Sequence, residues 1–181
     1  GATASSALLK SALLNTANDL GNDGPDFIYG WGKVNALKAL QLIEDNRYFS
    51  ASVAQGDSNI HTITIPSGVL RAKIMVYWAD QQASTSASYA LVNDLDASVS
   101  SPSNFVYLPW ILDHSPNPVT LADPATRGED HLNNMEQVAI NDPNAGSYEL
   151  KVKGTTLPFG NHEYFVLYEF LYDDITVTFP M

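Results

Sequence analysis

Two carboxylates stand two residues apart in a run that is typical of a β-strand. Asp94 and Asp96 lie within residues 91–99, where apolar side chains flank both acids. Because side chains alternate between the two faces of a strand, the two acids share one face and their apolar neighbours Leu95 and Ala97 occupy the other. Two acids on one face indicate either a solvated rim of a sheet or a bound cation.

A second pair of oxygen-bearing side chains has the same spacing. Asn134 and Glu136 stand two apart where another strand is predicted, at residues 136–140. Calcium takes six to eight oxygen ligands from carboxylates, amides, backbone carbonyls and water. If the two strands are neighbours, Asp94, Asp96, Asn134 and Glu136 converge as a set that suits a hard cation better than zinc. The sequence therefore predicts these four residues as metal ligands, with calcium as the ion.

The same acids have an interpretation that needs no ion. Asp94 and Asp96 could cap strand ends or pair with Arg71 or Arg127. Asp80 is a further candidate ligand, and formation of a turn at a strand end is its alternative role.

Catalytic residues are not predicted in this chain. Serines and aspartates accompany four histidines, which are His61, His114, His131 and His162. The neighbouring pairs at 113–114 and 130–131 cannot act together on extended backbone, because adjacent side chains point apart. No segment reads Gly-Thr-Ser or Gly-x-Ser-x-Gly. The histidines are expected at the surface or at the rim of a sheet.

The charge composition of the chain argues against some classes of binding partner. Nine lysines and arginines against twenty acids give the 181-residue chain a formal net charge of −11. Such a surface repels phosphate backbones and anionic lipid, which disfavours nucleic-acid and membrane partners. No apolar run reaches the ~20 residues that span a bilayer. With no cysteine, disulfides, thiol catalysis and thiolate metal sites are excluded.

The first part of the chain reads as helical. Ser5 or Ser6 can cap a helix that turns Leu8, Leu9, Ala12 and Leu13 inward, with Gly21 as its stop signal. Asn35 can cap a second helix whose inward residues are Val34, Leu37, Leu40 and Ile43. Two such helices cannot form a domain alone. The apolar faces that carry Leu8, Leu13, Leu37 and Leu40 therefore need a partner, either the following sheet or protein outside this chain.

After Arg47 the apolar pattern changes to an alternation of period two. The predicted strands cover 48–54, 61–65, 70–78, 92–100, 104–108, 136–140, 147–153 and 164–171. Their number and spacing predict an antiparallel sandwich of jelly-roll type. The proline-rich segment 109–133 is predicted to be a functional loop, an insertion, or both. The predicted units are helices at 1–46, a β-sandwich at 47–172, and a linker or the start of a further β-domain at 173–181, where the run 175–180 suggests that the native chain continues.

Aromatic residues permit a different function. Jelly-roll folds often bind sugars by stacking them on exposed rings, and Tyr77, Trp78, Tyr107 and Trp110 could serve. In the alternative interpretation Trp78 fills the core and Trp110 anchors the long loop.

Several segments resemble one family of enzymes. Residues 7–17, Ala-Leu-Leu-Lys-Ser-Ala-Leu-Leu-Asn-Thr-Ala, and residues 29–36, Tyr-Gly-Trp-Gly-Lys-Val-Asn-Ala, are similar to the end of a subtilisin-like (subtilase, peptidase family S8) serine protease catalytic domain. Trp-Ala-Asp at 78–80, Ala-Leu-Val-Asn-Asp-Leu-Asp at 90–96, Asn-Asn-Met-Glu-Gln-Val at 133–138 and Ala-Gly-Ser-Tyr at 145–148 resemble the C-terminal β-barrel of a secreted branch of that family.

The resemblance implies a function for the parent protein. Such a parent would be a secreted serine endopeptidase that cleaves peptide substrates with a Ser-His-Asp triad. The motifs of that triad lie upstream of what this chain contains, so the chain alone is expected to be inactive. It is expected to dock on the missing catalytic domain and stabilise it, and related barrels imply bound calcium. A carbohydrate- or surface-binding jelly-roll module is the alternative.

Overall fold

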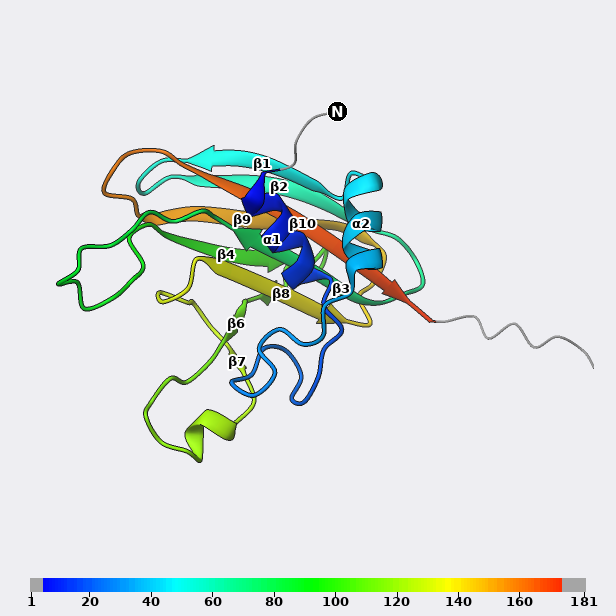
Figure 1. Cartoon of the computed structure of the whole chain (residues 1–181). Helices are drawn as coiled ribbons and strands as arrows, with labels where there is room; N and C mark the ends of the chain where they lie inside the picture. Colours follow the sequence, from blue (N-terminus) through cyan, green and yellow to red (C-terminus); the bar gives the residue numbers. More distant parts are fainter. Residues whose placement is uncertain (1–4, 174–181) are drawn as a thin grey trace, which may run out of the picture.

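The computed structural model describes residues 5–173, which form two helices and a sandwich of two antiparallel sheets (Figure 1). The helices are α1 (Ser6–Asn15) and α2 (Ala36–Glu44). The strands are β1 (Tyr48–Val53), β2 (Ser58–Ile65), β3 (Val69–Tyr77), β4 (Asp94–Ser100), β5 (Val106–Tyr107), β6 (Trp110–Ile111), β7 (Thr126–Arg127), β8 (Met135–Asn141), β9 (Gly146–Thr156) and β10 (His162–Tyr172), with a 3₁₀ turn η1 (Thr120–Ala122).

The strand order is that of a jelly roll. One sheet runs β1-β10-β3-β8 and the other runs β2-β9-β4-β5, with every paired strand antiparallel. Successive strands alternate between the two sheets at both ends of the chain, as in a double Greek key. The predicted mainly β fold, an antiparallel jelly-roll-like sandwich preceded by two helices, is confirmed.

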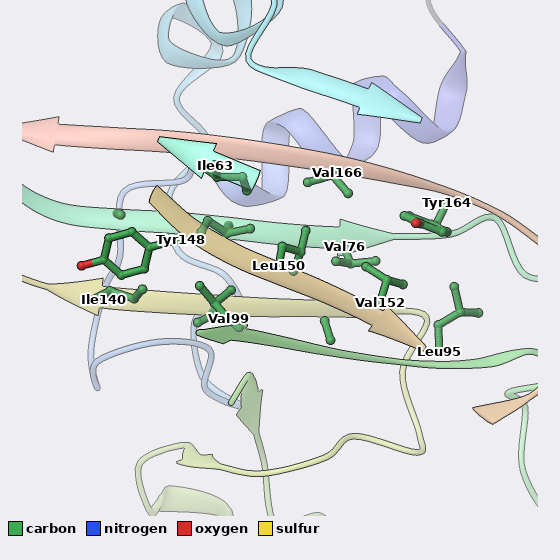
Figure 2. Packing of buried hydrophobic residues seen from close by; sticks show 14 of the residues in the cluster. Ile63, Val76, Leu95, Val99, Ile140, Tyr148, Leu150, Val152, Tyr164 and Val166 are labelled. Atoms are coloured by element: carbon green, nitrogen blue, oxygen red, sulfur yellow. The ribbon is translucent and has the colours of Figure 1, made fainter. Parts of the chain in front are cut away.

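The main core lies between the two sheets (Figure 2). Leu95, Ala97 and Val99 point inward from β4 and meet Leu150 and Val152 of β9 and the facing residues of the other sheet. This inward set leaves the alternate residues of β4, including both acids, on the outer face of their sheet. The alternation read from the sequence therefore fixed which face of β4 carries the carboxylates.

The helices cover the outer face of the sheet that contains β3 and β10 (Figure 1). Ser5 caps α1 by accepting from the Leu8 amide at 3.1 Å, and Asn35 caps α2 by accepting from the Lys38 amide at 3.1 Å. Both predicted caps are confirmed. The strand β3 is buried on both faces as a result, which explains its nearly continuous apolar sequence.

Two details of the helices differ from the sequence interpretation. The helix α1 ends at Asn15 and not near Gly21, with Thr16 as its C-cap, and the Thr16 side chain donates to the Ala12 carbonyl. The inward residues of α2 are Ala39 and Leu42, whereas Leu37 and Leu40 are exposed. The helix carries apolar residues on opposite sides, and the smaller alanine lets it approach the sheet closely.

Leu37 and Leu40 do not stand alone at the surface. The predicted inward positions of Leu9 and Leu13 of α1 and of Val34 just before α2 are also wrong, because all three are exposed, and Leu37 is the most exposed leucine of the group at 65%. We call these five residues the helix face. Its side chains point away from the sheet that the two helices cover.

The long segment 109–133 contains a short hairpin of β6 and β7. Trp110 on β6 packs against Gly24, and the guanidinium carbon of Arg127 lies 3.2 Å from the centre of the Trp110 ring. Arg127 also donates to the Ala139 carbonyl at 2.8 Å. The hairpin is thereby fixed both to the loop between the helices and to β8.

The predicted run at 175–180 lies outside the described residues. Among the residues that the structure describes, no helix has the length and apolar character needed to cross a membrane.

Candidate metal site

Asp94 and Asp96 lie at the start of β4, beside β9. A register shift between Asp94 and Leu95 lets the strand bend here, and the Thr155 hydroxyl on β9 donates to Asp96 Oδ2. The side chains of both acids are largely buried, with 13% exposed in each. The partner strand β5 pairs only with Val99 and Ser100, so this end of β4 has a free edge.

The loop before β8 brings His131 to the two aspartates. Its Nδ1 lies 2.8 Å from Asp94 Oδ2 and 3.6 Å from Asp96 Oδ1. Asp130 shapes the loop, because its carboxylate accepts from the Leu132 and Asn133 amides and from the Asn133 side chain. Potential ligand atoms of Asp94, Asp96 and His131 all lie within 4.8 Å of one another.

Glu136 approaches the same place from the opposite sheet. It belongs to β8 and shares the inward face of that strand with Val138 and Ile140, so its carboxylate points into the sandwich. There its Oε2 accepts the Ala97 amide of β4. The short β5 leaves that amide without a strand partner, and the carboxylate supplies one. The strands β4 and β8 thus face each other across the sandwich and are not neighbours in one sheet.

Asp94, Asp96 and Glu136, which we call the acid cluster, are linked through Asp96, whose carboxylate disfavours the charged forms of both Asp94 and Glu136. Burial raises the pKa of Glu136 well above its usual value, and the nearby carboxylates of Asp96 and Asp130 raise it further. Burial also raises the pKa of Asp94, against the opposing effect of His131. Carboxylates that are buried together without a compensating cation favour protonation.

Each acid of the cluster keeps one oxygen without a partner. Within residues 5–173, Asp94 Oδ1, Asp96 Oδ1 and Glu136 Oε1 are buried and make no hydrogen bond. Buried polar atoms are nearly always satisfied, and orphaned carboxylate oxygens are especially costly. A divalent cation beside Asp94 and Asp96 could satisfy their two orphaned oxygens and remove the repulsion between their charges, whereas Glu136 is not among the ligand atoms that lie within 4.8 Å of one another. The donor set, mostly carboxylate oxygen, suits a hard ion such as calcium.

The other residues predicted as metal ligands or as ion-pair partners of Asp94 and Asp96 make contacts elsewhere. Asn134 lies just before β8, and its amide donates to the Trp78 carbonyl at 2.6 Å. Asp80 accepts from the Val92 and Asn93 amides at 2.7 and 3.0 Å, so it ties the end of β3 to the segment just before β4 across the intervening loop, which is neither a local turn nor a contact with Asp94 or Asp96. Arg71 lies 2.6 Å from Asp23 and not beside Asp94 or Asp96.

The candidate sugar-binding rings offer little open surface. Trp78 is fully buried in the core, where its indole donates to the Asn93 carbonyl at 2.8 Å, and Tyr77 is buried under α1. Tyr107 packs against the core, and Arg127 covers one side of Trp110. The core role of Trp78 and the anchoring role of Trp110 both correspond to the alternative interpretation of these rings.

His131 is the one site residue that the sequence interpretation missed. Its neighbour Asp130 was considered as its partner, whereas the structure pairs it with Asp94, 37 positions away. The available sequence signal was Asp130 itself, because an aspartate side chain often accepts from the backbone N–H two residues later and so forms a turn. Such a turn at residues 130–133 fixes the loop that carries His131. In the described part of the chain no serine hydroxyl is hydrogen-bonded to His131, so the Asp94–His131 pair is not part of a hydrolytic triad there.

Comparison with known proteins gives one informative match. The chain is 25% identical over 175 residues, 90% of its length, to the serine protease/ABC transporter B family protein tagA of Dictyostelium discoideum. The matched segment makes up 10% of that relative, so the chain spans about a tenth of the relative's length. No protein-family model matches the chain. The structure is similar to that of Bacillus licheniformis lipase BlEst2 in its propeptide form, with a TM-score of 0.40 and 9% identity over 68% of this chain and 22% of that one.

The chain is thus similar to part of a larger protein that is named as a serine protease. The described residues form a β-sandwich with an acidic site at one edge and no assembled hydrolytic triad around His131.

Proposed function

We propose that this chain is a non-catalytic β-sandwich region of a secreted, subtilisin-like serine endopeptidase, and that it stabilises the catalytic domain by docking on it. The observation that carries the proposal is the helix face. Leu9, Leu13, Val34, Leu37 and Leu40 are exposed together on two helices whose opposite sides already cover the sheet.

Several observations support the remainder of the parent chain as the occupant of the helix face. The two helices correspond to the segments that resemble the end of a subtilase catalytic domain, where such leucines would be interior. The similar protein from Dictyostelium is about ten times longer than the matched segment, so much more protein is available there to cover the face. Each leucine that becomes buried contributes about 1.5–3 kcal/mol.

Docking on the catalytic domain has a two-part test. The double variant Leu37→Ser/Leu40→Ser should change the unfolding free energy of the isolated chain by less than about 0.5 kcal/mol, because both residues are exposed. In the longer protein that includes the catalytic region, it should cost about 3 kcal/mol. Ile60→Ser, at an exposed residue of β2, is the control and should be neutral in both. Equal effects of the leucine variant in the two proteins would contradict docking.

The acid cluster supports a second part of the proposal, which is that the region binds calcium. Asp94, Asp96 and Glu136 would supply carboxylate oxygens, with backbone carbonyls and water completing the coordination. Bound calcium would connect β4 to β8 and the His131 loop across the open edge of the sandwich. A cation at this position stabilises the region without taking part in hydrolysis.

Calcium binding is tested by thermal unfolding with excess calcium and with chelator. At a calcium concentration one hundred times the dissociation constant, the native state gains about 2.7 kcal/mol. Asp96→Asn should remove most of the difference in melting temperature, whereas the control Asp57→Asn, at an exposed acid before β2, should keep it. Identical melting temperatures of the unaltered chain in both buffers would exclude a stabilising calcium site.

A further inference from the structure

We propose that a groove beside the acid cluster binds a polypeptide segment in which a lysine or arginine stands next to an apolar side chain. The groove has a volume of about 560 Å³, within the range of ligand-binding sites. It lies between the long loop after β3, the segment that follows β6, and the loop that carries His131. This surface shares no residue with the helix face, so the inference does not depend on docking to the catalytic domain.

One wall of the groove is apolar. Tyr89, Ile111, Leu112 and Leu132 line it, and they come from the loop after β3, the end of β6 with the residue that follows it, and the loop before β8. Tyr89 is 65% exposed, which leaves its ring available to a ligand. An apolar side chain of a bound peptide can pack on the leucine and isoleucine residues, and the aliphatic stem of a lysine or arginine can lie along the same wall.

Acidic residues also line the groove. Glu129 and Asp130 belong to its lining with His114 and His131, and no lysine or arginine is among the lining residues. The Glu129 carboxylate is mostly exposed, and its nearest ion-pair contact is His131 Nε2 at 3.9 Å. Asp94 and Asp96 lie directly behind His131 and add negative potential. The groove thus attracts a cation beside an apolar surface, and an ammonium or guanidinium group at Glu129 can also approach the Tyr89 ring.

Two labelled peptides of equal length test the groove by fluorescence anisotropy, one with the central sequence Leu-Lys-Leu and the other with Leu-Glu-Leu. The lysine peptide should bind the 181-residue chain at least about tenfold more tightly, since the glutamate peptide places like charges together. Glu129→Gln should weaken binding of the lysine peptide about fivefold, the upper range for an exposed ion pair. Glu163→Gln, at an exposed acid of β10, is the matched control and should have no effect.

Tyr89→Ala provides a second variant that cannot disturb the core, because that residue is exposed. This variant should bind the lysine peptide more weakly, because the ring contacts both the apolar and the cationic side chains of the peptide. Its melting temperature should equal that of the unaltered chain. The titrations are run with calcium and with chelator, so that loss of the cation site is separated from loss of peptide binding. Equal affinity for the two peptides, absence of binding to either, or equal affinities of Glu129→Gln and Glu163→Gln would overturn the proposal.

Discussion

Two groups of buried charged side chains in this molecule differ in whether they contain cations that balance their carboxylates. Beneath α1, Lys73 Nζ lies 3.2 Å from Glu169 Oε2 and donates to the carbonyls of Asn15 and Ala17 at 3.1 and 3.0 Å. Lys38 approaches Glu169 from α2 at 3.7 Å. At the open edge of the sandwich, Asp94, Asp96 and Glu136 are buried with three orphaned oxygens. The first group contains its own buried cations, whereas the second has only the half-exposed His131 and Lys153, whose Nζ lies 3.9 Å from Asp96 Oδ2, or an ion from solution.

The difference separates a structural contact from a binding site. The Lys73–Glu169 pair balances its own charge, although Glu169 Oε2 makes no hydrogen bond within residues 5–173, and losing one member leaves the other charge uncompensated. The Lys73–Glu169 pair holds the end of α1, where backbone carbonyls favour a positive charge. An excess of buried carboxylates costs free energy in the empty protein, and a cation recovers it. Removing a charge should therefore have opposite effects in the two groups.

The largest effect is expected from Lys73→Met. Methionine fills the volume of the lysine stem but leaves Glu169 and the carbonyls of Asn15 and Ala17 without their buried cation. The unfolding free energy should fall by about 3–5 kcal/mol, measured by urea denaturation. Lys153→Met is the control, because that lysine is half-exposed and 3.9 Å from Asp96, and it should change stability by less than about 1 kcal/mol. A similar small change in both variants would remove the contrast between the groups.

Glu136→Gln should have the opposite sign in calcium-free buffer. The amide oxygen can still accept the Ala97 amide, while the buried negative charge and its repulsion toward Asp96 disappear. We expect the unfolding free energy to rise by on the order of 1 kcal/mol at neutral pH. A loss of several kcal/mol would mean that the charged form of Glu136 is stabilised by contacts within the protein.

The pH dependence of the unfolding free energy should also distinguish the acid cluster from the Lys73–Glu169 pair. Burial raises the pKa values of Glu136 and Asp94 in the native state. Between the unfolded pKa and the raised native pKa, the native state binds more protons, so stability from these groups decreases as pH rises. In calcium-free buffer, the advantage of Glu136→Gln over the unaltered chain should therefore grow as the pH rises above the usual glutamate pKa of about 4.3. Urea unfolding at each pH measures it, and a constant difference would indicate an ordinary carboxyl pKa.

The sequence predicted much of the fold because its signals are local. Period-two alternation located the strands and put Asp94 and Asp96 on one face of β4, and short side-chain oxygens identified the caps Ser5 and Asn35. The ambiguous case was α2, which has apolar residues on opposite sides. Burial of Ala39 and Leu42 in place of Leu37 and Leu40 depends on how closely the helix approaches β10.

The candidate site was only partly predictable because it is assembled across the sandwich. The inward direction of Glu136 follows from its register with Val138, but its contact with the Ala97 amide requires β5 to be short. The position of His131 depends on how a 25-residue segment folds over the edge, and no periodicity encodes that path. Charge balance was likewise hidden, since Arg71 and Arg127 pair elsewhere.

Calorimetric titration with calcium tests the central claim most directly. The unaltered chain should bind one calcium ion at the acid cluster, and Glu136→Gln should weaken binding by at least about tenfold because one of three carboxylates is lost. Asp57→Asn should leave the titration unchanged. Absence of calcium binding, or equal binding by the unaltered chain and Glu136→Gln, would contradict the assignment of the acid cluster as a calcium site.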